Sequence, residues 1–312
     1  MFDRIGLPKA VTVYEVGPRD GLQNEAKTLP TATKAELIRR LAGAGIPAIE
    51  VASFVRPDLI PALADAEELA TELAPLFGTH RMSALVPNQR GLDRAMKTGI
   101  REVAVFASAT ESFAKANLNN TVAGALDIFT PVIKQARDAG LQVRGYISMC
   151  FGDPWEGKVA TNQVADVAER MFADGITELS LGDTIGVATP GDVVDLLNVL
   201  DARGIRRSQL AVHFHDTYGQ ALSNTLTALQ EGISIVDSSI GGLGGCPFAK
   251  SATGNLSTED LVWQLHGLGI STGIDFKKLL DTSRWLGKTT GLTIRSKTAI
   301  ALADDKEMVE PE

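Results

Sequence analysis

The strongest constraint on the fold is the eightfold recurrence of a short apolar run followed by a stretch of helical pattern. The runs are nearly continuous in β-branched and apolar residues, which is typical of parallel strands covered by helices. They occupy residues 11–16, 48–54, 81–86, 102–108, 141–149, 178–183, 210–215 and 234–239. Eight such repeats in one chain predict an α/β fold, a closed TIM (β/α)8 barrel rather than an open doubly wound sheet.

The segments between and after the runs carry the helical part of the pattern. Residues 33–45, 192–204 and 219–232 are amphipathic and end at glycine, which favours a left-handed C-cap. Beyond the eighth run there is more helical sequence than barrel closure requires. We predict a single TIM-barrel catalytic domain over residues 1–312, with a frayed acidic tail. Within 258–303 we predict additional C-terminal helices at 258–268, 275–287 and 296–303.

Charge and cysteine content exclude several classes of protein. The formal net charge of -8 argues against nucleic acid as a partner, because duplex binding needs an extended basic face. Two cysteines, Cys150 and Cys246, are too few for a disulfide framework. No apolar run reaches the roughly 18–20 residues of a membrane span, and the N-terminal residues lack a signal pattern. We therefore predict a cytoplasmic protein with no membrane partner.

Polar residues at the predicted carboxyl ends of the strands are the candidates for chemistry, because TIM-barrel sites lie there. His213 and His215 alternate along one run, so their imidazoles face the same side. Two imidazoles near carboxylates suit a divalent metal, although two structural histidines would show the same pattern. Asp20 can supply a carboxylate oxygen and Asn255 an amide oxygen, which leaves magnesium, manganese and zinc open. In isolation, the pair Asp20-Gly21 is the signature of a turn.

Other reactive residues also follow predicted strands. Arg19 is either a structural ion-pair partner or a fixed cation aimed at charge that develops in a transition state. Glu50 lies in an apolar run, where a carboxylate needs a partner, and Asp183 occupies a similar position. Cys246 follows a glycine-rich segment and is either an acid–base group or a small buried hydrophobe. The spacing of those glycines does not match a nucleotide-phosphate fingerprint.

Seven sequence blocks in a fixed order carry a resemblance to a known family. The blocks are VGPRDGLQNE (16–25), EVASFV (50–55), RGYIS (144–148), LGDTIGV (181–187), HFHDTYGQALSNTL (213–226), VDSSIGGLGGCPFA (236–249) and GNLSTED (254–260). With these blocks the chain resembles the 3-hydroxy-3-methylglutaryl-CoA lyase family of metal-dependent barrel enzymes. The resemblance implies a carbon–carbon lyase acting on an acyl-CoA, in leucine degradation and ketone-body formation.

The resemblance also implies roles for individual residues. Arg19 matches the arginine that polarises the thioester carbonyl, and Cys246 matches a cysteine on a flexible loop. The implied metal ligands are Asp20, His213, His215 and Asn255. The implied active-site carboxylates are Glu50 and Asp183, with Tyr146 and Glu259 near the site. The residues expected to contact the substrate are Arg19, Ser53, Tyr146 and Thr184.

Two departures from the family pattern leave the acyl group open. Ala26 follows GLQNE where lysine is usual, and Lys27 is displaced by one position. Asp153 and Trp155 stand where cysteine and tyrosine are expected. A redox-responsive C-terminal cysteine and a mitochondrial leader, present in some members, have no counterpart here. We therefore expect a bacterial or otherwise untargeted member of the family.

These residues suggest cleavage of 3-hydroxy-3-methylglutaryl-CoA to acetyl-CoA and acetoacetate, with a divalent cation holding the tertiary hydroxyl. Asp183 or His213 would take the hydroxyl proton. Arg19 would meet the enolate oxygen, and Cys246 would help to protonate the enolate carbon. Alternatives are a lyase for citramalyl-CoA or a longer branched 3-hydroxyglutaryl-CoA, a Claisen synthase, and an acyl-CoA-binding barrel without catalysis. A homodimer or higher homo-oligomer is expected.

Overall fold

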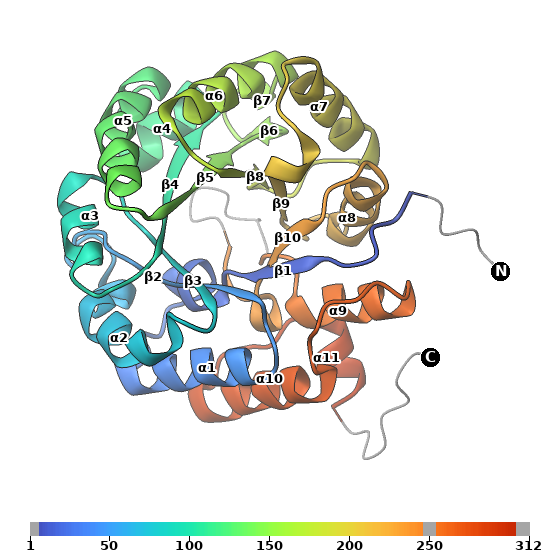
Figure 1. The fold of residues 1–312 in the computed structure, drawn as a ribbon. Helices are drawn as coiled ribbons and strands as arrows, with labels where there is room; N and C mark the ends of the chain where they lie inside the picture. The colour runs from blue at the N-terminus through green and yellow to red at the C-terminus, as the bar shows by residue number, and fades with distance from the viewer. Residues whose placement is uncertain (1–5, 246–253, 304–312) are drawn as a thin grey trace.

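The computed structural model describes residues 6–245 and 254–303, and its centre is a closed barrel of eight parallel strands (Figure 1). Neighbouring strands follow the order β1-β10-β9-β8-β5-β4-β3-β2, and β2 pairs with β1 to close the barrel. The strands are β1 (Thr12–Glu15), β2 (Ala48–Ser53), β3 (Arg81–Leu85), β4 (Glu102–Ser108), β5 (Gln142–Ser148), β8 (Glu178–Asp183), β9 (Leu210–Phe214) and β10 (Ile235–Ser238). Each of the eight predicted runs contains one of them, so the predicted TIM barrel is confirmed.

Helices surround the barrel as an outer layer (Figure 1). They are α1 (Thr31–Gly43), α2 (Ala66–Leu73), α3 (Gln89–Met96), α4 (Glu111–Leu118), α5 (Val122–Asp138), α6 (Thr161–Asp174), α7 (Pro190–Ala202), α8 (Ala221–Gln230), α9 (Thr258–Gly267), α10 (Phe276–Thr290) and α11 (Lys297–Ala301). The additional C-terminal helices are present: α10 packs against α1 and α9, and α11 packs against both α9 and α10. No helix within the described ranges has the length and apolar content to cross a bilayer.

The main hydrophobic core lies between the strands and the helices. Leu37, Ile38 and Leu41 form the buried face of α1, at the spacing expected for an amphipathic helix. Thr189 is the N-cap of α7 and forms a capping box with Asp192, which satisfies N–H groups at the start of the helix. The capping residues and the apolar periodicity therefore favour the same helices. Because the barrel strands are all parallel, their carboxyl ends lie on one side of the barrel.

A small antiparallel hairpin after β5 was not predicted. It consists of β6 (Gly152–Asp153) and β7 (Gly157–Lys158). The Asp153 Oδ1 atom accepts hydrogen bonds from the N–H groups of Trp155 and Glu156 at 2.7 and 2.9 Å. This local turn chemistry, rather than apolar periodicity, determines the hairpin, so the search for apolar runs missed it.

The inside of the barrel is polar, whereas TIM barrels usually fill this space with branched apolar side chains. Arg144 of β5 is buried there, with Cζ 3.7 Å from the centroid of the Tyr14 ring. Its guanidinium donates to Glu178 Oε1 at 2.7 Å and to Asp237 Oδ1 at 2.6 Å. Buried charges need close partners, so these four residues, the polar floor, form a fixed layer beneath the strand ends.

Candidate active site

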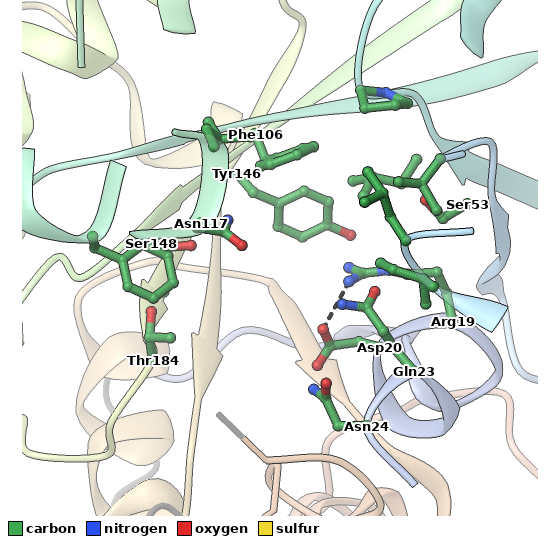
Figure 2. Close-up of a pocket in the computed structure, with 18 of the residues that line it drawn as sticks. Arg19, Asp20, Gln23, Asn24, Ser53, Phe106, Asn117, Tyr146, Ser148 and Thr184 are labelled. Carbon is green, nitrogen blue, oxygen red and sulfur yellow. Dashed lines mark hydrogen bonds and ion pairs between the residues drawn. The ribbon is translucent and has the colours of Figure 1, made fainter. Parts of the chain in front are cut away.

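A cavity of about 850 Å³ opens at the carboxyl ends of the barrel strands (Figure 2). Two parts of its lining differ in chemistry. The first, here called the polar wall, comes from the ends of β1 and β9 and includes Arg19, Asp20, His213 and His215. The second, here called the apolar wall, comes from β3, β4, α4 and α5 and includes Leu85, Phe106, Phe113, Ile128 and Phe129.

Three of the four predicted metal ligands form a compact cluster in the polar wall. Asp20, His213 and His215 each offer a ligand atom, and these atoms lie within 4.8 Å of one another. The fourth, Asn255, forms a β-bridge with His215 and donates from Nδ2 to Asp20 Oδ2 at 2.9 Å. Its Oδ1 atom is buried without a hydrogen-bond partner among the described residues. The structure thus brings all four predicted side chains together.

This donor set fits a divalent cation. Two imidazoles, a carboxylate and an amide oxygen are ligands that such cations take in proteins, and a buried amide oxygen is rarely left without a partner. Burial would raise the pKa of Asp20, but the Arg19 guanidinium and the His213 imidazole lower it overall. The carboxylate is therefore ionised at neutral pH, as ligation requires. Ligation itself stays a prediction.

Asp20 stands on η1 (Gly17–Gly21), a π-helical turn that follows β1 directly. The N–H groups of Asp20 and Gly21 both donate to the Val16 carbonyl, at 2.7 and 3.2 Å. A side chain at Gly21 would clash, because its Cβ would lie 2.7 Å from Ser239 Oγ. The Asp-Gly pair is therefore not a solvent-exposed turn but part of a segment packed against the end of the last strand.

Arg19 is held between two carboxylates at the edge of the cavity. Its Nε donates to Glu50 Oε2 at 2.6 Å, and its Nη1 donates to Asp20 Oδ1 at 2.7 Å. The guanidinium carbon lies 5.7 Å from the centroid of the Tyr146 ring, which points toward it in Figure 2. Burial raises the pKa of Glu50 overall, although Arg19 opposes the shift. Arg19 can therefore be both a structural ion-pair partner and a fixed cation for the reaction, since the ion-paired guanidinium also lines the cavity.

The other residues expected to contact the substrate also line the cavity. Ser53, Tyr146 and Thr184 all do so, and Figure 2 shows them around the same space. Tyr146 is fixed from below, because its hydroxyl accepts a hydrogen bond from Arg144 Nη1 at 2.7 Å. The Thr184 hydroxyl accepts the N–H of Met149 at 2.9 Å. Their positions fit the expected contacts, which remain predictions.

The family model described as HMGL-like matches residues 10–286 of the chain. The chain belongs to the HMGL-like family. The mitochondrial hydroxymethylglutaryl-CoA lyase of Arabidopsis thaliana is 49% identical to it over 297 residues, which make up 95% of this chain and 63% of that protein. The mitochondrial hydroxymethylglutaryl-CoA lyase of Bos taurus is 47% identical over 295 residues, which make up 95% of this chain and 90% of that protein.

Solved structures of HMG-CoA lyases share the fold of this HMGL-like chain. The enzyme from Bacillus subtilis matches with a TM-score of 0.92 and 44% identity, over 96% of this chain and 99% of that one. An HMG-CoA lyase from Acinetobacter baumannii, in complex with coenzyme A and 3-methylmalate, matches with a TM-score of 0.87 and 37% identity. That match covers 97% of this chain and 98% of the other. The family predicted from the seven sequence blocks is therefore confirmed.

In this HMGL-like chain, Asp183 ends β8 and binds the loop that follows. Its Oδ1 accepts the N–H of Val187 at 3.0 Å, and its Oδ2 accepts the N–H of Ala188 at 3.1 Å. Burial raises the pKa of Asp183 to about 6, against the effect of these hydrogen bonds. Its neighbours Gly182 and Thr184 are among the described residues that line the cavity, whereas Asp183 is not. Its role as a base stays a prediction.

Cys246 lies outside the described residues, but the glycine segment that leads to it is described as far as Gly245. Asn24 donates from Nδ2 to the Gly245 carbonyl at 2.7 Å. A Cβ at Gly244 would lie 2.7 Å from Asn255 Nδ2, and this residue has a φ of +100°. Glycine is therefore required where the backbone passes against a predicted metal ligand.

Two buried glutamates hold the backbone beneath the polar wall, and sequence reasoning missed the first. Glu15 Oε1 accepts the N–H groups of Gly17 and Ile240 at 2.7 and 2.9 Å, and Oε2 accepts the Thr258 hydroxyl at 2.6 Å. Burial raises the pKa of Glu15 to about 7. Glu259, expected near the site, likewise accepts a backbone N–H of the glycine segment. It is not among the described residues that line the cavity.

Asp237 was also missed. It is the register partner of His213 in the barrel, and its Oδ2 lies 3.4 Å from His213 Nδ1. Burial would raise the pKa of Asp237, but the Arg144 guanidinium and the His213 imidazole together outweigh burial, and the pKa is lowered to about 2. The available signal was a carboxylate inside the apolar run 234–239. Its charge partner, Arg144, is 93 positions away in the sequence.

Proposed function

We propose that this chain is a hydroxymethylglutaryl-CoA lyase, a carbon–carbon lyase that cleaves 3-hydroxy-3-methylglutaryl-CoA to acetyl-CoA and acetoacetate. Proteins of that name are 45% to 49% identical to it over 95% of its length. The observation that carries the proposal is one cavity that contains both the Asp20–His213–His215 cluster and the Arg19 guanidinium. A ligand cluster and a fixed cation together suit the cleavage of a hydroxyacyl thioester.

Asp20, His213, His215 and Asn255 would hold the divalent cation. The mixed oxygen and nitrogen donors suit Mg²⁺ or Mn²⁺, and Zn²⁺ is the alternative. When bound, the cation supplies Lewis-acid polarisation of a substrate oxygen. The Asn255 Oδ1 atom, which has no hydrogen-bond partner in the described part of the chain, and the proximity of the other three ligand atoms support this assignment.

Arg19 is the group that would meet the thioester oxygen. Cleavage breaks the bond between C2 and C3 of the acyl chain, and its electron pair moves into the thioester enolate. Glu50 and Asp20 already hold the guanidinium at the cavity edge, so little reorganisation is needed as charge develops. The Tyr146 ring beside it would keep water away from the developing oxyanion.

One proton must leave the tertiary hydroxyl, and one must reach the enolate carbon. Asp183, with a pKa of about 6, suits a general base near neutral pH, and His213 is the alternative. Cys246, one residue beyond the described glycine segment, would help to deliver the second proton. The hydroxyl carbon then becomes the ketone of acetoacetate, and the enolate carbon becomes the methyl group of acetyl-CoA.

Product analysis tests the proposed function. Purified protein with Mg²⁺ or Mn²⁺ should release equal amounts of acetyl-CoA and acetoacetate from the methylglutaryl thioester. Citramalyl-CoA and a longer branched 3-hydroxyglutaryl-CoA belong in the same panel, because Ala26 and Asp153 depart from the family pattern. Faster turnover of either would reassign the substrate. Acyl-CoA binding without turnover of any substrate would favour the barrel without catalysis.

We also propose a homodimer or higher homo-oligomer that works in the cytoplasm, in leucine degradation and ketone-body formation. Trp263 on α9 and Ile300 on α11 expose apolar side chains on the C-terminal helices, which supports an interface there. A Rattus norvegicus relative named as a cytoplasmic lyase is 46% identical. Light scattering on the purified protein tests the assembly, and imaging of the tagged chain in cells tests the compartment.

A further inference from the structure

A carboxylate lies directly behind one of the proposed metal ligands. Asp237 of β10 and His213 of β9 are Cα partners in the parallel sheet, so both side chains project to the same side of the barrel wall. The His213 Nδ1 atom lies 3.4 Å from Asp237 Oδ2, which is within ion-pair distance but longer than an ordinary N–H···O hydrogen bond. Among the described residues this buried nitrogen has no hydrogen-bond partner. Asp237 is therefore the acceptor that this nitrogen faces.

The Asp237 carboxylate is immobilised by the polar floor. Arg144 Nη2 donates to Oδ1 at 2.6 Å, and Arg144 Nη1 approaches Oδ2 at 3.3 Å. The Ser180 hydroxyl donates to Oδ2 at 2.8 Å. Arg144 is itself fixed by Glu178 and by the ring of Tyr14. Because the carboxylate cannot turn away, Oδ2 stays directed at the imidazole.

We propose that Asp237 is a positioning residue that accepts the Nδ1–H of His213 and so fixes the tautomer of this ligand. With the proton on Nδ1, the Nε2 lone pair is left for the cation shared with Asp20 and His215. Carboxylates behind ligating histidines orient the ring and raise its basicity in the same way. The inference rests on the cation site of the proposed function, but not on the identity of the substrate.

The assignment also bears on the proton transfer. A His213 ring with Nδ1–H donated to Asp237 and Nε2 bound to a cation has no free lone pair. His213 could not then take the hydroxyl proton. Of the two candidate bases, this leaves Asp183. The competing view is that Asp237 serves only as the counter-ion of Arg144, in which case the His213 tautomer would not depend on it.

The tautomer of the native protein is the first test. The chain has four histidines, so the long-range ¹H–¹⁵N spectrum of protein labelled with ¹⁵N-histidine is simple enough to assign. A His213→Gln variant identifies the His213 signals by their loss. We expect the cation-free protein to carry the His213 proton on Nδ1. A proton on Nε2 would overturn the proposal. This test uses the native protein and needs no variant at position 237.

The second test measures cation affinity without turnover, using Mn²⁺ alone and detecting it by electron paramagnetic resonance. Asp237→Asn places an amide in the same space, and an N–H directed at Nδ1 favours the Nε2–H tautomer. We expect Mn²⁺ affinity to fall about 10–100-fold, the usual cost of losing a partner behind a metal ligand. The His213 signals should change to the other tautomer in the same variant.

Glu178→Gln is the matched control, because it makes the same chemical change at another Arg144 partner that does not face His213. Its Mn²⁺ affinity and His213 tautomer should equal those of the native chain. Equal losses of Mn²⁺ affinity in both variants, or no loss of affinity in Asp237→Asn, would refute the positioning role of Asp237. If Asp237→Asn does not fold, the native tautomer decides alone. Native protein that binds no Mn²⁺ would instead refute the cation site of the proposed function.

Discussion

The two walls of the cavity are built in different ways. In the polar wall the functional groups contact other polar side chains: Arg19 donates hydrogen bonds to Glu50 and Asp20, and His213 Nδ1 lies 3.4 Å from Asp237 Oδ2. The apolar wall has van der Waals contacts instead, and one of its members, Ile128, is 44% exposed. The difference suggests that reacting groups are fixed in place, while the surface that receives the rest of the substrate is less constrained.

The physical reason lies in what each kind of side chain costs to bury. An unpaired buried charge is strongly destabilising, so charged groups under a cavity persist only where their partners are also fixed. Apolar side chains exchange for others of similar volume at a cost of about 1 kcal/mol, because their contacts are not directional. Changes in the polar wall should therefore abolish function, and changes in the apolar wall should adjust it.

Removal of the cation has the largest expected effect on the polar wall. Chelation should lower turnover at least about 10³-fold, since polarisation of a substrate oxygen contributes several kcal/mol. Added Mg²⁺ or Mn²⁺ should restore activity to the native protein but not to His215→Ala. His266→Ala is the control, because His266 is not among the described residues that line the cavity. Full activity after chelation would mean that the cluster has no catalytic cation.

Replacing the guanidinium should have the next largest effect. Arg19→Met should lower kcat about 10²–10³-fold, the usual cost of losing one oxyanion donor, while Mn²⁺ affinity is largely retained. Arg19→Lys should recover only part of the activity, because an ammonium cannot reproduce the contacts to Glu50 and Asp20 together. Single-turnover kinetics with the methylglutaryl thioester measure the effect. A loss of Mn²⁺ affinity as large as the loss of kcat would make Arg19 a structural residue.

The same contrast explains how much of the molecule could be predicted from the sequence. The eight apolar runs predicted the barrel because a covered parallel strand is recognisable from about six consecutive residues. His213 and His215 were found because their alternation is local. Glu15 and Asp237 were missed, since their partners lie 225 and 93 positions away and are brought close only by barrel closure.

The position of Asp20 shows a second limit. Its neighbour Gly21 favours a turn, whereas the π-helical segment around it packs against Ser239, which directly follows the last barrel strand. Only the family resemblance favoured Asp20 as a metal ligand over Asp20 as a turn residue. The apolar wall has no comparable signature, because Phe106 and Phe113 look like ordinary core residues in the sequence.

Glu15 links the polar wall to the stability of the fold. Burial raises its pKa from the usual 4.5 to about 7, so the folded state binds the proton more tightly than the unfolded state. The free energy of unfolding contributed by this group therefore increases as the pH falls through 7. Between pH 8 and pH 5.5 the increase should be about 2 kcal/mol.

Urea unfolding of the native protein and of Glu15→Gln at both pH values measures this effect. The native protein should gain about 2 kcal/mol relative to the variant as the pH falls. Glu68→Gln, at an exposed position of α2, should show no such difference. A native-minus-variant difference that does not change with pH would mean that Glu15 is not protonated near neutral pH in the folded state.

The smallest expected effect is on the apolar wall. Ile128→Ala removes part of a half-exposed side chain, at a cost of about 1 kcal/mol in substrate contact, so KM should rise about fivefold. We expect kcat to stay unchanged, because a contact made equally in the ground and transition states affects binding alone. Val194→Ala, which shortens a partly exposed side chain on α7 that is not among the described residues lining the cavity, is the matched control and should change neither constant. If kcat instead fell while KM stayed constant, the apolar wall would act on the reacting atoms. The functional difference between the polar wall and the apolar wall would then not hold.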